Sequence, residues 1–225
     1  MPKKNPINAA QTTLKITNRS GAEVKVYLTL GAAAGCVQDI KAIPLVTHPV
    51  NRLQGWFVLP HGATKTYAPP HGQGISGNFA FGSPPLNCPT DEYRKGVNLA
   101  EFILNNSFQG SGAQETIDIS CVAGANALIA FAMSGGARWN AGSSHPAVSQ
   151  FANKPLGQNT GLVGVFPCGC DNCTSRAKPP QPSCPKSPPP PAYEHFQSQP
   201  ICNVQRDAAN SGGDVEVIFH AFLPN

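Results

Sequence analysis

Two acidic residues, Glu101 and Asp118, stand in two segments that alternate apolar and polar residues. This period of two is typical of half-buried β-strands. A loop that contains Gly110, Ser111 and Gly112 separates the segments, which predicts a hairpin. In that hairpin the two acids lie near each other on the polar side. Facing carboxylates are unfavourable unless the protein uses them, so this pair is the first candidate for function.

Cleavage of a glycosidic bond uses two neighbouring carboxyl groups. One protonates the leaving oxygen, and the other activates water or attacks the sugar itself. Glu101 is the better general acid, because Phe102 and Ile103 flank it and desolvation favours a protonated carboxyl group. Asp118 then acts as the base. Inverting and retaining mechanisms both remain open. So do two other roles for the pair, which are sugar binding without catalysis and a purely structural one.

Three further residues are candidates for contact with a sugar. Glu115 precedes Asp118 by three positions, which puts it on the opposite face of a regular strand, so it reaches the same cleft only through a bulge or at the strand's end. Tyr93 and Trp139 are the expected stacking platforms for sugar rings. The other aromatic side chains that we considered, most of them expected in the core, are Trp56, Tyr67, Phe79 and Phe81.

Composition favours a β-rich protein with long loops. The 225 residues include 22 glycines and 23 prolines, the chain shows no long helical periodicity, and 40% of the residues are hydrophobic, enough to build a core. The net charge of +4 comes without a dense basic run, which argues against a nucleic-acid partner and fits weak attraction to an anionic cell wall. No apolar run approaches the length of a membrane span.

The strand pattern predicts one β core, residues 12–134 plus 203–225. The first two strands are expected to form a hairpin around residues 18–21, and the last strand is expected to return to the main sheet. The predicted strands cover residues 13–17, 23–30, 55–59, 77–81, 99–105, 117–120, 127–133 and 214–222.

Residues 135–202 form a predicted loop domain, rich in Gly, Pro and Cys, that is inserted into the core. The chain has eight cysteines, and an even count in a loop-rich chain favours disulfides and an oxidising compartment. Four of them could instead hold Zn²⁺, but their irregular spacing favours a disulfide cluster, so we expect neither metal nor cofactor. These four are Cys168, Cys170, Cys173 and Cys184.

Four segments, in this order along the chain, resemble thaumatin-like proteins. They are Ile16-Thr-Asn-Arg19, Leu99-Ala-Glu-Phe102, Ile117-Asp-Ile-Ser120 and Val215-Glu-Val-Ile-Phe219. The resemblance implies a flattened β-sandwich, an inserted disulfide-rich loop domain and an acidic cleft between them. It also implies a secreted, pathogenesis-related type of protein that acts on β-1,3-glucan, by binding, by weak glucanase activity or by antifungal action.

The chain departs from that family at several positions. Ser20 and His220 stand where family members have two bonded cysteines, so we expect sheet pairing alone to hold the first and last strands. The expected cleft has fewer charged residues than in the family, because no Arg stands near residues 77–82 and Ala130 replaces an acid. The residues after Met1 show no signal-peptide pattern. We therefore expect that the chain was trimmed and given a starting Met.

The sequence therefore predicts a secreted, monomeric protein that binds β-1,3-glucan in defence or at the cell wall. The alternative is an endo-β-1,3-glucanase. A further alternative is a cleft that has been turned to an unrelated ligand or reaction.

Overall fold

The computed structural model describes residues 11–85, 97–106, 113–120, 126–135, 204–207 and 210–222. Within these ranges the chain forms eleven β-strands and a short 3-10 turn, Ile40–Ala42. The strands are β1 (Thr12–Asn18), β2 (Val24–Leu30), β3 (His48–Pro49), β4 (Gln54–Leu59), β5 (Thr64–Tyr67), β6 (Ile75–Phe81), β7 (Leu99–Leu104), β8 (Ala113–Ser120), β9 (Ala127–Ser134), β10 (Val204–Asp207) and β11 (Gly213–Phe222).

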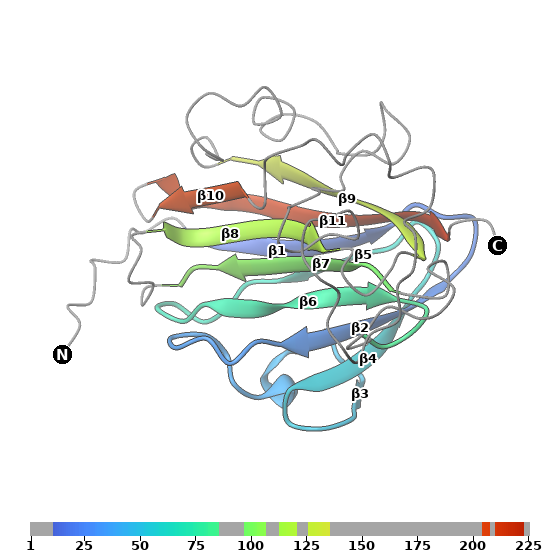
Figure 1. Ribbon diagram of the computed structural model, residues 1–225, viewed down its shortest axis with the longest axis horizontal. Helices are drawn as coiled ribbons and strands as arrows, with labels where there is room; N and C mark the ends of the chain where they lie inside the picture. The colour runs from blue at the N-terminus through green and yellow to red at the C-terminus, as the bar shows by residue number, and fades with distance from the viewer. Residues whose placement is uncertain are drawn as a thin grey trace, which may run out of the picture.

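The strands make two sheets. An antiparallel sheet of seven strands has the order β10-β8-β7-β6-β2-β4-β3, and a sheet of four has the order β5-β1-β11-β9. Figure 1 shows the larger sheet in front, with β1, β5 and β11 behind it. The prediction of an all-β sandwich is confirmed.

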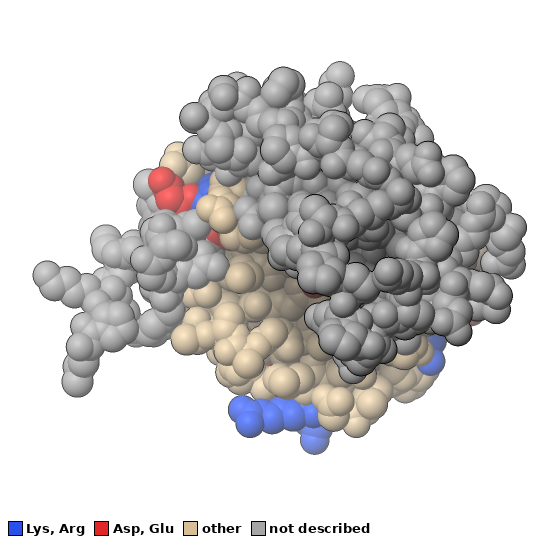
Figure 2. Space-filling view, viewed as in Figure 1, with Lys and Arg blue, Asp and Glu red and all other residues tan. Residues whose placement is uncertain are grey.

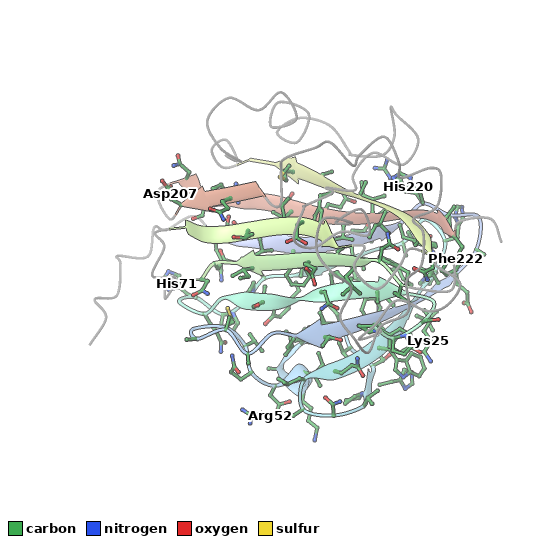
Figure 3. The ribbon with its side chains drawn as sticks, viewed as in Figure 1. Lys25, Arg52, His71, Asp207, His220 and Phe222 are labelled. Atoms are coloured by element: carbon green, nitrogen blue, oxygen red, sulfur yellow. The ribbon has the colours of Figure 1, made fainter. Side chains whose placement is uncertain are left out.

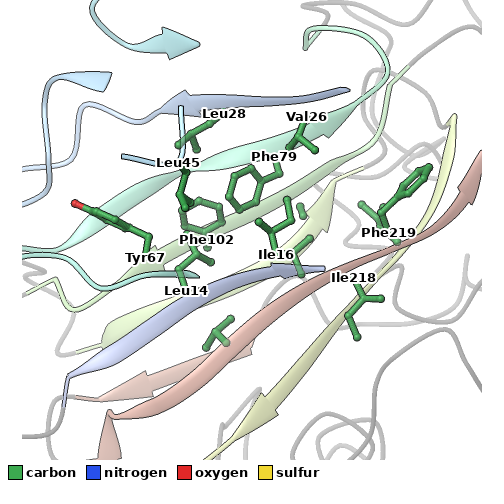
Figure 4. Close-up of a cluster of buried hydrophobic side chains, with 14 of the residues drawn as sticks. Leu14, Ile16, Val26, Leu28, Leu45, Tyr67, Phe79, Phe102, Ile218 and Phe219 are labelled. Carbon is green, nitrogen blue, oxygen red and sulfur yellow. The ribbon is translucent and has the colours of Figure 1, made fainter. Parts of the chain in front are cut away.

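The core lies between the two sheets, and strand alternation explains why. In β2, the buried residues Val24, Val26, Leu28 and Leu30 alternate with partly exposed polar ones. Successive side chains of a strand point to opposite faces, so one face is apolar and the other is polar. Figure 4 shows the interior that results, in which aromatic rings of the larger sheet pack beside aliphatic side chains of β1.

The first and last strands lie side by side, as expected. β1 and β11 pair in parallel over their shared length, from Thr12 opposite Gly213 to Asn18 opposite Phe219. The backbone N–H of Arg19 then donates to the carbonyl of Phe219 at 2.8 Å. Sheet pairing thus joins the two strands next to Ser20 and His220.

The predicted hairpin between β1 and β2 is wrong, because the two strands belong to different sheets. Asn18 explains the crossing. Its buried side-chain amide donates to the carbonyls of Leu59 at 2.9 Å and Ala22 at 2.8 Å, and its Oδ1 accepts from the N–H of Ser20. These bonds tie the chain to β4 of the other sheet, so residues 19–23 form an arch rather than a hairpin turn.

The predicted division into domains stays a prediction. Every strand of the described residues falls inside 12–134 or 203–225, while the inserted segment, apart from Gly135, lies outside the described residues. Cys36 is a buried free thiol whose pKa is raised to about 12 by burial. The even cysteine count therefore does not translate into four disulfides. The other seven cysteines lie outside the described residues.

No helix in the described part of the chain has the length and apolar character that crossing a bilayer requires.

Candidate functional site

The hairpin that carries the two acids is present. β7 and β8 pair antiparallel, and Glu101 stands directly opposite Asp118. Both side chains are partly exposed, while their strand neighbours Phe102 and Ile117 are buried in the core. The apolar neighbours anchor one face of the hairpin in the sandwich, which fixes both carboxyl groups on the outer face of the seven-stranded sheet.

The acid pair continues into a line of polar residues across the sheet. Asn78 on β6 is opposite Glu101, Thr29 on β2 is opposite Asn78, and Gln54 on β4 is opposite Thr29. We call these residues, from Asp118 through Glu101 to Gln54, the polar row. Neighbouring strands lie about 4.8 Å apart, so the row extends about 19 Å over five strands that lie side by side in Figure 1.

A hydrogen bond joins two neighbouring side chains of the polar row. Gln54 Nε2 donates to Thr29 Oγ1 at 3.0 Å. The Oδ1 atom of Asn78 is buried and accepts no hydrogen bond in the described structure. A buried acceptor without a donor is costly, so it is a place where a ligand hydroxyl would be favourable. The sequence contained a signal for Asn78, since it is the polar residue between Gly77 and Phe79 in a strand, but we had singled out acids and aromatics.

Trp56 lies beside the polar row, but its ring faces are occupied. The ring of His48 stacks on it with centroids 3.7 Å apart, and the Lys25 ammonium lies 3.8 Å from its centroid. Because the stacked imidazole covers one face, the ammonium must lie over the other. Trp56 is thus held in a cation–π and stacking arrangement and presents no free face to a sugar ring.

The other described aromatic candidates are core residues, as expected. Phe79 and Phe81 are fully buried, and Tyr67 is 5% exposed. The two predicted stacking platforms, Tyr93 and Trp139, lie outside the described residues, so their roles stay predictions.

The expected role of Glu115 as a sugar contact is wrong. Its side chain is fully buried on the core face of β8, where Arg206 Nε donates to its Oε2 at 2.7 Å. The N–H of Asn105 donates to Oε1 at 3.1 Å, and Arg206 also donates to Thr12 Oγ1 at 2.9 Å. Strand parity is the reason, because residues 115 and 118 point to opposite faces and no bulge reverses them. Glu115 instead pairs with Arg206, whose guanidinium reaches Thr12 of the other sheet.

Away from the acid pair, the charged side chains visible on the described surface lie near its edges. Figure 2 shows Lys and Arg atoms at its lower edge and acidic atoms near its upper left edge, with mostly uncharged atoms on the described surface between them. Figure 3 identifies Arg52 and Asp207 at these two edges. Arg52 Nε donates a hydrogen bond to the carbonyl of Gln38 at 3.1 Å. Among the described residues, no group of three or more His, Cys, Asp or Glu is arranged to hold a metal.

Comparison with known proteins finds a structural similarity and no sequence match. No protein-family model matches the chain, and no curated protein matches its sequence. Among solved structures, the chain is similar to a thaumatin-like xylanase inhibitor at 14% identity and a TM-score of 0.35, with 92% of this chain and 97% of the inhibitor covered. The sandwich described above therefore rests on this chain's own strand pairing.

Proposed function

We propose that this protein binds β-1,3-glucan at a site centred on Glu101 and Asp118, from which the polar row extends across the sheet. The observation that carries the proposal is their register, which sets two partly exposed carboxyl groups directly opposite each other on the outer face of the sheet. The proposal includes a secreted monomer that acts in defence or at a cell wall.

Sugars fit this surface for a chemical reason. A glucan carries many hydroxyl groups, and a carboxylate accepts hydrogen bonds from hydroxyls more strongly than a neutral acceptor does. The row adds the Asn78 amide and the Thr29 hydroxyl to the two acids. β-1,3-glucan is favoured over other glycans by the thaumatin-like motifs around residues 99–102 and 117–120.

Hydrolysis of the same glucan is the second candidate, and the register also favours it. Directly opposed strand residues have β-carbons about 4.5–5.5 Å apart. From there the side chains are long enough to reach the separation that a retaining enzyme needs, about 5–5.5 Å, or the wider one of an inverting enzyme, about 6.5–9.5 Å. Glu101 would be the general acid and Asp118 the base or nucleophile. Tyr93 and Trp139 would stack on the sugar rings in either role.

The test is to titrate a soluble β-1,3-glucan into the protein and its isosteric variants. We expect Glu101→Gln and Asp118→Asn each to weaken binding about tenfold, since each removes a charged hydrogen-bond acceptor. Asp207→Asn is the matched control, because Asp207 is an exposed acid of the same sheet outside the row. Absence of binding by the wild type, or equal weakening by the control, would contradict the proposal.

Reducing ends distinguish the two candidates in the same samples. Release by the wild type that disappears in both Glu101→Gln and Asp118→Asn would establish the hydrolase. Binding with no release would support a binding protein. Circular dichroism of each variant confirms that the sandwich is intact.

A further inference from the structure

We infer that Asn18 is a modification site at which an N-linked glycan and the folded sandwich exclude each other, so that glycosylation of Asn18 diverts the chain from folding. The residues Asn18-Arg19-Ser20 form the acceptor pattern Asn-x-Ser, in which the amide nitrogen of the Asn side chain receives the glycan. The inference is independent of the glucan site and of the two acids there.

The first argument is the place of Asn18 in the fold. Asn18 ends β1 and is fully buried, whereas glycans are attached at surface positions. Its Nδ2 atom donates one hydrogen bond to the carbonyl of Ala22 at 2.8 Å and another to the carbonyl of Leu59 at 2.9 Å. A side-chain amide nitrogen carries two hydrogens, so both are in use.

The orientation of this amide follows from its other atom. The Oδ1 atom of Asn18 accepts from the backbone N–H of Ser20 at 2.9 Å and from the Ser20 hydroxyl at 2.7 Å. A backbone N–H can only donate and a carbonyl can only accept, so the oxygen faces Ser20 and the nitrogen faces the two carbonyls. The hydroxyl of the acceptor pattern is thus bonded to the same buried side chain.

The second argument is the geometry of a glycan on Nδ2. Transfer from a lipid-linked sugar pyrophosphate breaks the bond between C1 of the sugar and a phosphate oxygen, forms a bond from C1 to Nδ2, and releases one amide proton. The new bond is about 1.45 Å long, so C1 would lie between Nδ2 and one carbonyl oxygen, closer to that oxygen than the nitrogen is now. The same carbonyl would lose its donor. A chain with a glycan on Asn18 therefore cannot form the arch of residues 19–23.

The third argument is the order in which the partners are made. The bond from Asn18 to Leu59 joins residues 41 positions apart. At about 5–20 residues per second, Leu59 is synthesised roughly 2–8 s after Asn18. During that time the amide is open to a glycosyltransferase. In a compartment that glycosylates emerging chains, attachment of the glycan and closing of the arch therefore compete for the same nitrogen.

A second acceptor pattern, Asn105-Asn106-Ser107, also begins at a buried asparagine. The Nδ2 atom of Asn105 donates to the carbonyl of Thr12 at 2.8 Å, and its Oδ1 accepts from the N–H of Thr12 at 2.8 Å. This amide links the end of β7 in one sheet to β1 in the other. The experiment therefore has to separate the two patterns.

The experiment produces the full chain in a host that secretes it through an N-glycosylating compartment. Mass spectrometry of peptides then measures the glycan occupancy of Asn18 in the secreted, folded protein and in the protein retained by the cells. We expect the occupancy to be at least tenfold higher in the retained protein. Secreted protein that carries the glycan at Asn18 and unfolds like unmodified protein would overturn the inference. So would the absence of glycan at Asn18 from both fractions.

Ser20→Ala removes the first acceptor pattern and leaves the Asn18 amide in place. Its yield of folded protein relative to the wild type should be at least threefold higher in the glycosylating host than in a host without N-glycosylation. Ser107→Ala, alone and in combination, isolates the second pattern in the same way. An equal relative yield of Ser20→Ala in both hosts would mean that the side chain and not the glycan matters, and the inference would fail.

Gly62→Asn is the matched control, because it creates an acceptor pattern with Thr64 at an exposed position. Gly62 has a φ of 73°, which Asn tolerates better than most residues, and a β-carbon there would meet no atom within 4 Å. Added to Ser20→Ala and Ser107→Ala, it should give protein that is glycosylated at the new position, secreted and folded. If a glycan at this exposed position reduces the yield as much as one at Asn18, burial of Asn18 is not the cause and the inference is wrong.

Discussion

Glu115 and Asp118 lie three residues apart on β8, yet the structure uses the two acids in opposite ways. Glu115 faces the core, is fully buried, and forms an ion pair with Arg206. Asp118 faces outward, is partly exposed, and stands opposite another acid, Glu101. Strand parity alone decides which side of the sheet each carboxyl group occupies.

The difference teaches how to separate a structural acid from a candidate functional one. A buried carboxylate must be paired, and Glu115 has its cation together with a backbone N–H from Asn105. A partly exposed carboxylate keeps contact with water and does not need a buried cation. Removing Glu115 should therefore cost more stability than removing Glu101 or Asp118.

The largest expected effect is on the buried pair. Arg206→Met leaves the Glu115 carboxylate buried without its cation and should lower the free energy of unfolding by about 3–5 kcal/mol, measured by urea denaturation. Combining it with Glu115→Leu should restore most of the loss, because no unpaired charge then remains. A loss below about 1 kcal/mol for Arg206→Met would contradict the structural role of the pair.

Replacing a Glu with Gln on the core face and on the outer face of the seven-stranded sheet sharpens the comparison. Glu115→Gln should cost about 3 kcal/mol or more, since it leaves Arg206 unpaired in the core. Glu101→Gln should change the stability by less than about 1 kcal/mol, because its side chain is partly exposed. Equal losses in urea denaturation would mean that Glu101 is also a structural acid.

An ion pair on the outer face of the four-stranded sheet extends the comparison to an exposed pair of opposite charges. The Lys15 ammonium lies 2.6 Å from Asp214, and each side chain is about one third exposed. Lys15→Met should cost only about 0.2–1 kcal/mol, and about 1 M salt should remove most of the difference from the wild type. Thermal unfolding at low and high salt checks this. A loss as large as that of Arg206→Met would mean that exposure does not separate the two ion pairs.

The smallest expected effect is a pH dependence at His220. Burial and then the nearby Arg19 charge lower the pKa of His220 from its ordinary value of 6.5. The unfolded chain therefore binds the proton more readily. Stability from this group is complete above pH 6.5 and falls as the pH drops toward the folded-state pKa. Unfolding profiles measured as the pH falls should show the wild type losing stability relative to His220→Gln, and parallel profiles would contradict the effect.

The sequence was sufficient to predict the elements that position the acid pair. Alternation at residues 99–105 and 117–120 predicted the β7–β8 hairpin, the closeness of Glu101 and Asp118, and the separation of Glu115 from their face, while the structure supplies the register itself. The final strand also returned to β1 as expected. In each case an apolar face had one place to be buried, so local pattern and tertiary structure agreed.

The sequence was insufficient where a strand had no apolar pattern or where pairing was distant. β5 is a short polar strand between Pro- and Gly-containing turns, and β10 contains Val204 followed by Gln, Arg and Asp. Arg206 was therefore missed, although a fully buried acid at 115 requires a cation somewhere. The β1–β2 arch was missed because the sequence of a turn does not determine which sheet each of the two strands joins.

The parallel pairing of β1 with β11 has a consequence for how the chain folds during synthesis. Partners such as Thr12 and Gly213 are separated by about 200 residues. At about 5–20 residues per second, β1 leaves the ribosome roughly 10–40 s before its partner exists. Through that interval β5 can pair with one edge of β1, but the edge that pairs with β11 stays open, and an open strand edge favours association with other chains. The rate of synthesis and the supply of chaperones should therefore affect the yield of this protein.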